Sequence, residues 1–188
     1  MNQIIRHPKI LKREKTVLLI VDIQERIINA MTEKDRLIEN NLKLIKGMKI
    51  LNVPIYFTEQ YPKGLSTTLP EIKNELDSTE SIIKMSFSCA GAGDLFLQFK
   101  QRGLEQVVIT GVESHVCVQQ TVLDLLANNF QVDVAADAVS SRRTFDYQTA
   151  LARMGKAGAE ITSTESILFE LLTVCGTDEF KSISRLVK

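Results

Sequence analysis

The chain is poor in the residues that build small disulfide-rich or aromatic-rich proteins. Its 188 residues include no tryptophan, two histidines, three cysteines and only 6% aromatic residues. Three unevenly spaced cysteines make a poor disulfide framework, which favours a reducing compartment. Two histidines, His7 and His115, are far apart in the sequence, so they predict no metal site.

The sequence also lacks an excess of charge of either sign. Lysine plus arginine and aspartate plus glutamate both number 23. A chain without net charge creates no long-range field that would recruit nucleic acid or an anionic membrane. The basic stretch at residues 6–15 is interrupted by apolar residues and is interpreted as a solvated arm. We therefore expect neither nucleic acid nor a membrane as a partner.

Long apolar segments are missing as well. No run is long enough to span a membrane, and the first residues lack the apolar region typical of a signal peptide. Together with the cysteine content, this predicts a cytoplasmic protein. A length of 188 residues with 44% hydrophobic residues predicts one globular domain over residues 1–188.

Short apolar runs alternate with segments of helical periodicity. Strands are expected at residues 16–22, 53–58, 81–85, 106–112, 131–137 and 159–162. Helices are expected at residues 35–51, 95–102, 117–127, 146–154 and 164–173. This alternation predicts an α/β fold, a three-layer α/β/α sandwich around a six-stranded parallel sheet of the Rossmann-like kind. The segment 59–79 is expected to be irregular, a rim or lid.

Three chemically unusual side chains fall at predicted strand ends. Asp22 ends an apolar strand, Lys84 lies within another, and Cys117 follows a third at the start of a helix. Ligands of parallel α/β sheets bind beyond the carboxyl ends of the strands. A withdrawn acid and lysine favour an ion pair, and a helix N-terminus favours the thiolate over the thiol.

These residues suffice for covalent acyl transfer. Asp22 would take the proton of Cys117, give it to the leaving nitrogen, and later activate water against the thioester. Lys84 would orient Asp22 and favour the thiolate. Backbone N–H groups at the helix start, including that of Cys117, would bind the oxyanion.

Six segments carry a wider resemblance. They are residues 18–24 (LLIVDIQ), 58–65 (TEQYPKGL), 84–89 (KMSFSC), 111–117 (GVESHVC), 136–142 (ADAVSSR) and 162–170 (TSTESILFE). From about residue 10 to 175 the chain resembles the isochorismatase-like cysteine hydrolases, and most of all the isochorismatase domain-containing proteins. The resemblance implies a triad of Asp22, Lys84 and Cys117. It also implies a cis peptide between Val112 and Glu113 that aims the Glu113 and Cys117 amides at the oxyanion.

Two details of the resemblance narrow the expected function. True isochorismatases lack the cysteine, so Cys117 points towards hydrolysis of a C–N bond. Nicotinamidase relatives carry an Asp-x-His metal motif after the second strand, whereas this chain reads Thr58, Glu59, Gln60 there. We therefore expect no metal and no cofactor. The family often forms homo-oligomers, and we expect the same here.

The substrate is expected to be a small molecule. By their place at the strand ends, the candidates for contacting it are Gln24, Gln60, Tyr61, Phe87 and Val112. Three alternatives stay open: a vinyl ether or ester hydrolase that does not use the cysteine, a non-catalytic oligomeric scaffold that retains the triad, and a redox-sensing cysteine.

Overall fold

In a computed structural model, six parallel strands form one sheet in the order β3-β2-β1-β4-β5-β6. The structure describes residues 6–77 and 79–188. The strands are β1 (Thr16–Val21), β2 (Ile55–Gln60), β3 (Ile82–Lys84), β4 (Gln106–Val112), β5 (Gln131–Ser140) and β6 (Glu160–Thr162). The predicted sheet is confirmed. Two predicted positions were inexact: β2 lies two residues later than expected, and β5 continues three residues further.

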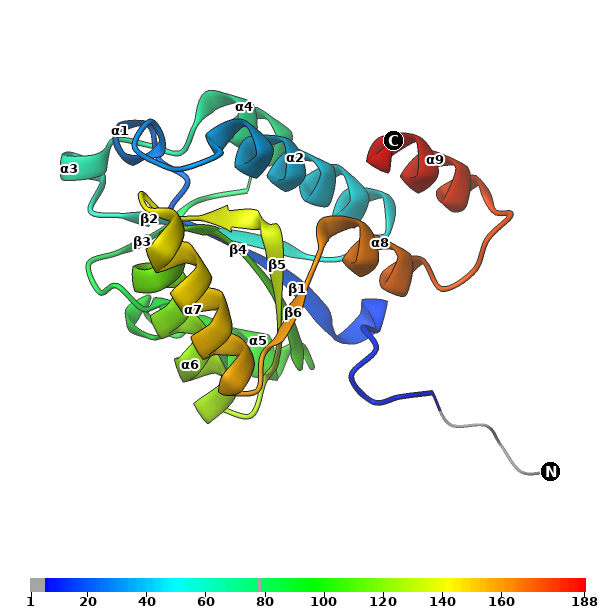
Figure 1. Cartoon of the computed structure of the whole chain (residues 1–188). Helices are drawn as coiled ribbons and strands as arrows, with labels where there is room; N and C mark the ends of the chain where they lie inside the picture. Colours follow the sequence, from blue (N-terminus) through cyan, green and yellow to red (C-terminus); the bar gives the residue numbers. More distant parts are fainter. Residues whose placement is uncertain (1–5, 78) are drawn as a thin grey trace.

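Helices cover both faces of the sheet, which gives the three expected layers (Figure 1). One face carries α2 (Lys34–Ile50), α4 (Pro70–Glu75), α8 (Thr164–Leu172) and α9 (Asp178–Val187). The other carries α5 (Leu95–Gln101), α6 (Gln119–Ala127) and α7 (Thr144–Lys156). The sequence pattern missed α9, whose buried Ile183 packs into the first face.

The alternation of side chains along β1 explains why its apolar run is continuous. Leu18 and Ile20 belong to the core beneath α2 and α8, whereas Val17 and Leu19 belong to the core beneath α5 and α6. Successive side chains of a strand point to opposite faces, so a strand covered on both sides needs an apolar residue at every position.

The chain reverses its direction of travel across the sheet after β3. From β1 it moves outward to β2 and β3, and it then returns to add β4, β5 and β6 on the other side of β1. The adjacent carboxyl ends of β1 and β4 are therefore the switch point, where α/β sheets bind ligands. The short helices α1 (Glu25–Ile28) and α3 (Pro62–Leu65) gather at this end of the sheet (Figure 1).

The segment 59–79 is more ordered than expected. It contains α3 and α4, and its residue Thr68 forms an antiparallel bridge with Gln24. The expectation of an irregular stretch was wrong because buried side chains pin the segment in place. Glu59 accepts hydrogen bonds from the Thr68 N–H and hydroxyl, each at 2.8 Å, and from the Ser81 hydroxyl at 3.2 Å.

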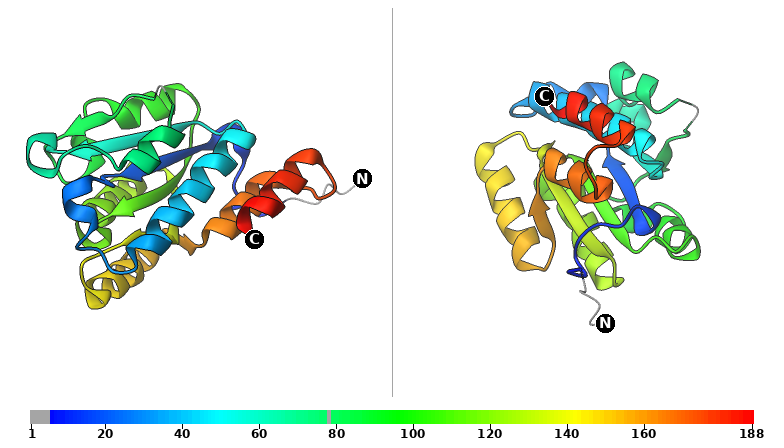
Figure 2. Two further views of the ribbon diagram at one scale, coloured as in Figure 1. Left: turned by 90° about the horizontal axis from the view of Figure 1, so that it is seen from above. Right: turned by 90° about the vertical axis from the view of Figure 1, so that its right-hand side faces the viewer.

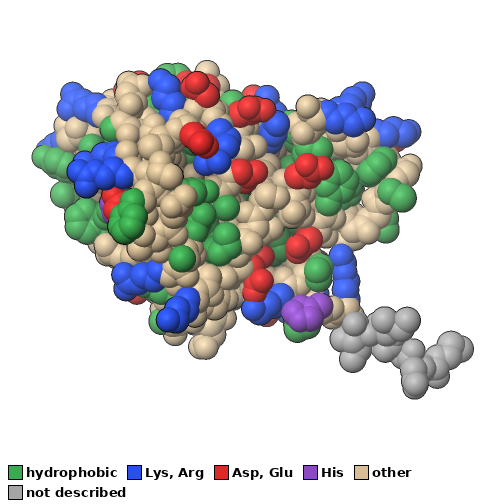
Figure 3. Space-filling view, in the orientation of Figure 1, with side chains coloured by type: hydrophobic (Ala, Val, Ile, Leu, Met, Phe, Trp, Pro, Cys, Tyr) green, Lys and Arg blue, Asp and Glu red, His purple; other side chains and the backbone are tan. Residues whose placement is uncertain are grey.

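The outer surface mixes charges of both signs. Figure 3 shows lysine and arginine side chains interspersed with aspartate and glutamate over the visible face. In Figure 2, α9 extends beyond α8 at the end of the molecule opposite to α3. No helix among residues 6–77 and 79–188 has the length and apolar character required to cross a membrane.

Candidate active site

Asp22 lies at the tip of β1 and is almost fully buried. Its backbone has a positive φ of 52°, an uncommon conformation in which Asp is over-represented and which here turns the chain away from the strand. The two carboxylate oxygens have different partners. Oδ1 accepts from the Thr58 hydroxyl at 2.7 Å, and Oδ2 accepts from Lys84 Nζ at 2.6 Å. The sequence analysis missed Thr58 as a partner, because the pairing depends on the register between β1 and β2.

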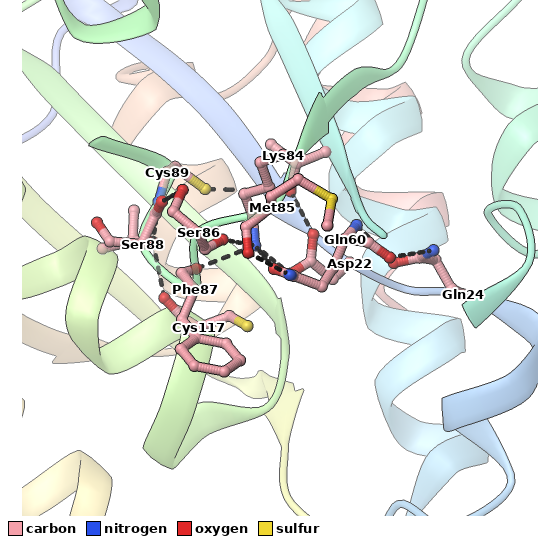
Figure 4. Close-up of polar contacts among 12 residues, drawn as sticks. Asp22, Gln24, Gln60, Lys84, Met85, Ser86, Phe87, Ser88, Cys89 and Cys117 are labelled. Carbon is pink, nitrogen blue, oxygen red and sulfur yellow. Dashed lines mark hydrogen bonds and ion pairs between the residues drawn. The ribbon is translucent and has the colours of Figure 1, made fainter. Parts of the chain in front are cut away.

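Lys84 reaches Asp22 across an intervening strand. It comes from β3, which is two strands from β1, a distance of about 10 Å at the usual strand spacing. Its ammonium also donates to Gln60 Oε1 at 2.7 Å and to the carbonyl oxygens of Phe87 at 2.9 Å and Ser86 at 3.3 Å. Figure 4 shows the ammonium among these acceptors, with Gln24 beyond Gln60. The long side chain of lysine spans the intervening strand, and its three N–H donors suit a site surrounded by acceptors.

Cys117 follows β4 in a short π-helical turn, η3 (Ser114–Val118), directly before α6. Its thiol is free, and the residue is 7% exposed. Cys117 and Asp22 line the same small pocket.

The resting state of Cys117 differs from the expectation that the thiolate is favoured. Burial, and after it the negative charge of Asp22, raises the pKa of the Cys117 thiol to about 12. Lys84 lowers that pKa, as expected, but its effect is the smaller one. Desolvation penalises the charged form of a buried thiol, so the neutral thiol prevails at pH 7.

The peptide between Val112 and Glu113 is cis. The Glu113 carbonyl accepts from the N–H groups of Val116 and Val118. Within the described residues, no hydrogen bond uses the N–H of Glu113 itself. The Glu113 carboxylate is buried and accepts from Arg142, through Nε at 3.0 Å and the backbone N–H at 3.1 Å.

A pocket of about 100 Å³ joins these groups. Among the predicted residues, it is bordered by Asp22, Gln60, Phe87, Val112, Glu113 and Cys117. Ile27, Leu65 and Val116 complete its wall. Ile27 and Leu65 were not predicted as wall residues, because they lie on α1 and α3, two helices too short to show a periodic pattern.

Two predicted substrate contacts lie outside this wall. The Gln24 side chain is fully buried, and its amide bonds to Gln60 O, Gln60 N–H and Ser66 O at 3.1, 2.8 and 2.7 Å. Gln24 therefore fastens β1 to the segment after β2 and has no free donor directed at a substrate. Tyr61 is 46% exposed, and its ring packs over Gly64.

Other polar residues near the site face elsewhere. His115 bonds to the Ser141 hydroxyl at 3.0 Å and lines a separate recess with Arg142, Arg143 and Asp146. Cys89 is buried behind the site, with its sulfur 4.0 Å from the Thr58 hydroxyl, and burial raises its pKa to about 11. Cys175 is exposed at the far end of the chain.

The position of the nicotinamidase metal motif does not fit a metal here. Glu59 is occupied by Thr68 and Ser81, Gln60 is bonded to Lys84, and Thr58 to Asp22. Within residues 6–77 and 79–188, no three His, Cys, Asp or Glu side chains are grouped so that they could hold a metal ion.

Comparison with known proteins identifies the family. Residues 16–166 match the isochorismatase domain. The chain belongs to the isochorismatase family. The isochorismatase family protein 1B of Dictyostelium discoideum is 38% identical over 179 residues, which covers 93% of this chain and 87% of that protein. The predicted resemblance to this superfamily is confirmed.

Solved structures agree with this assignment. A structure described as the MAR1 ribonuclease of Caenorhabditis elegans is 32% identical and has a TM-score of 0.88, covering 94% of this chain and 91% of that one. The YcaC protein of Pseudomonas aeruginosa, described with hexane-2,5-diol and covalent acrylamide, is 26% identical with a TM-score of 0.87, covering 95% and 91%. The family and fold support a hydrolase.

Proposed function

We propose that this chain is a metal-independent cysteine hydrolase that cleaves a C–N, amide-type bond of a small molecule through a thioester. The observation that carries the proposal is that Cys117 and Asp22 line one small pocket at the switch point of the sheet, and that the Lys84 ammonium is paired with Asp22. The related YcaC structure, whose description includes covalent acrylamide, supports an amide as the kind of molecule that enters such a pocket.

The raised pKa of Cys117 defines the task of Asp22. Because the resting thiol is protonated, attack on the carbonyl carbon requires a base at the same moment. Asp22 takes the thiol proton as the carbon–sulfur bond forms. It then gives this proton to the nitrogen as the C–N bond breaks and the amine leaves.

The second half of the reaction uses the same carboxylate. Asp22 takes a proton from water, whose oxygen attacks the thioester, and the proton returns to the sulfur as the carboxylic acid is released. Lys84 and Thr58 each donate to one oxygen of Asp22 and so fix the orientation of its carboxylate at the pocket. The N–H of Glu113, which no other group in the described chain uses, and that of Cys117 stabilise the oxyanion.

Three alternative functions are less well supported. A ribonuclease, the activity printed for the Caenorhabditis elegans relative, requires a surface for the phosphate backbone. The pocket here is about 100 Å³ and has a largely apolar wall. A vinyl ether or ester hydrolase that does not use the cysteine would leave the presence of Cys117 in the pocket unexplained. A scaffold would leave the unused N–H of Glu113 unexplained.

A panel of small amides tests the proposal, with amine release as the readout and intact mass after acid quench to trap an acyl group on Cys117. The native chain and the control Cys175→Ala, which removes an exposed thiol, are expected to release amine equally. Cys117→Ala should release none. Retained hydrolysis in Cys117→Ala would rule out a thioester intermediate and favour the cysteine-independent alternative. Absence of hydrolysis in every protein would favour the scaffold.

We further propose that the chain is a single cytoplasmic domain that self-associates. Free Cys89 and Cys117 fit a reducing compartment. Self-association is supported by Ile83, Met85 and Phe87, apolar residues on and after edge strand β3 that are 63%, 68% and 55% exposed. An exposed apolar edge is a ready surface for pairing.

A further inference from the structure

The two carboxylates that border the pocket are both paired with cations of the protein. Two carboxylates, Asp22 and Glu113, border the pocket, and the cations paired with them are Lys84 and Arg142. An anion is stable in a buried pocket only if a cation or several hydrogen-bond donors are free to receive it. Whether either cation is free therefore decides which substrates fit.

Lys84 has no donor left for a substrate. An ammonium carries three protons. Its three closest acceptors, Asp22 Oδ2, Gln60 Oε1 and the Phe87 carbonyl oxygen, lie at 2.6, 2.7 and 2.9 Å. The side chain is fully buried, so it cannot turn towards a ligand without breaking these bonds.

Arg142 is held outside the pocket wall. Its Nε and its backbone N–H both donate to Glu113 Oε2. The arginine lines the neighbouring recess with His115, Arg143 and Asp146, and it is absent from the residues that border the thiol. Glu113 thus neutralises Arg142, the arginine that forms an ion pair with a residue of the pocket wall. Arg26, beside Ile27 on α1, is exposed and donates to the Gly64 carbonyl oxygen outside the wall.

The rest of the wall is apolar. Ile27, Leu65, Phe87, Val112 and Val116 surround a space of about 100 Å³. A carboxylate on the substrate would lose its water there and face the carboxylates of Asp22 and Glu113, with no cation among the residues of the wall.

We propose that the pocket selects amides whose acyl part is small and uncharged, and that the Glu113–Arg142 pair sets this selectivity. The inference rests on the proposed function for the identity of the nucleophile. It adds the charge class of the substrate and names Glu113 and Arg142 as specificity-determining residues.

Two alkylating agents of similar size test the inference without hydrolysis. Iodoacetamide is neutral and iodoacetate is an anion, and peptide mapping reports the labelling rate of each cysteine separately. The ratio of the two rates at Cys117 is compared with the ratio at exposed Cys175 and at a free thiol in solution. We expect Cys117 to prefer iodoacetamide at least 10-fold more strongly than either reference. An equal or reversed preference overturns the inference.

Replacing Glu113 tests the specific role of the pair. Glu113→Gln removes the charge that neutralises Arg142, so the relative rate of iodoacetate at Cys117 should rise at least 5-fold. Glu80→Gln, which removes one exposed carboxylate elsewhere, should leave the ratio unchanged. An unchanged ratio in a folded Glu113→Gln variant assigns the selectivity to the apolar wall and removes the pair from the proposal.

A binding measurement covers the case in which the buried thiol resists both reagents or the Glu113 variant does not fold. The variant Cys117→Ala cannot form a thioester, and saturation-transfer NMR reports which ligand it binds. Malonamide and malonamate have the same number of heavy atoms and differ in one charge. Binding of malonamide and not of malonamate supports the inference even if no amide is hydrolysed, and the opposite result, or equal binding, rejects it.

Discussion

At the scale of single residues, the site holds a thiol whose protonation two neighbours influence in opposite directions. Asp22 raises the pKa of Cys117 and Lys84 lowers it, while burial has the largest effect and raises it. The buried thiol of Cys117 is therefore not a thiolate in the resting protein. The proposed reaction accordingly depends on a base beside a neutral thiol. The neutral thiol also weakens the case for a resting redox sensor, because oxidation requires the thiolate.

The substitution Asp22→Asn separates the two effects of this carboxylate. It removes the base, so amide hydrolysis should fall on the order of 10²–10⁴-fold. It also removes a negative charge and leaves Lys84 unpaired, so the pKa of Cys117 should fall and iodoacetamide labelling at pH 7 should become faster. Rate measurements on the two reactions, with circular dichroism as a check on folding, test this. Slower labelling in a folded variant would contradict the assigned role.

A second buried carboxyl predicts how stability changes with pH. Burial raises the pKa of Asp133 on β5 to about 7, against a hydrogen bond from Gln131 that lowers it, and nearby Glu170 and Glu160 raise it further. Between about pH 4 and pH 7 the folded chain retains a proton that the unfolded chain releases. This group therefore makes the free energy of unfolding fall as pH rises through that window, and the loss is complete above it.

Asp133→Asn should abolish this pH dependence. The variant is expected to be more stable than the native chain at pH 8, by roughly 2–4 kcal/mol, with a smaller advantage at pH 5. Urea denaturation at the two pH values measures both differences. The exposed control Glu80→Gln should change neither. An equal advantage of Asp133→Asn at pH 5 and pH 8 would show that the carboxyl does not titrate as described.

At the scale of secondary-structure elements, the contact between β1 and β4 brings the acid and the thiol together. Gly111 pairs with Val21, the residue before Asp22, and it lies six residues before Cys117. Its φ is +107°, and a Cβ atom there would lie 2.0 Å from the Val21 carbonyl oxygen. Only glycine allows both this conformation and this approach.

Gly111→Ala should therefore force the two strand ends apart. We expect it to lower the free energy of unfolding by more than about 3 kcal/mol, since backbone strain and a clash add. The matched control Gly103→Ala also has a positive φ, of +70°, but no atom lies within 4 Å of its Cβ. Its cost should be about 1–2 kcal/mol. Thermal and urea denaturation of both variants measure the difference, and equal costs would show that the close approach is unimportant.

At the scale of the whole molecule, one sheet separates two apolar cores, and its edge strand β3 lies beside the candidate site. Edge strand β3 is short and is followed by the exposed Met85 and Phe87, and Phe87 also borders the pocket. If chains associate through this edge, the association reaches the site itself. The edge formed by β3, Met85 and Phe87 is therefore the surface through which we expect the chains to associate.

The substitution Met85→Glu tests that surface. Placing a charge in an apolar contact should shift the mass measured by sedimentation equilibrium from an oligomer to a monomer at micromolar concentration. Val174→Glu, at an equally exposed apolar residue in the loop before α9, should leave the mass unchanged. A native chain that is monomeric, or a Met85→Glu chain that remains associated, would remove this edge from consideration.

The α/β alternation, the six parallel strands and the residues at their ends could all be predicted from the order of the amino acids. A strand buried on both faces must be continuously apolar, so a charged residue at its end stands out in the sequence. Asp22 and Lys84 were predicted for this reason, and Cys117 because it follows a strand at the start of a helix. The family resemblance predicted the cis peptide.

Which of these residues meet, and whether they are charged, could be seen only in the folded chain. The partners Thr58, Ile27 and Leu65, the withdrawal of Gln24 from the pocket and the pairing of Arg142 with Glu113 depend on strand register and on short helices without periodicity. The neutral thiol of Cys117 was likewise unpredictable. Desolvation depends on the full enclosure of the sulfur, and neighbouring residues in the sequence do not encode that enclosure.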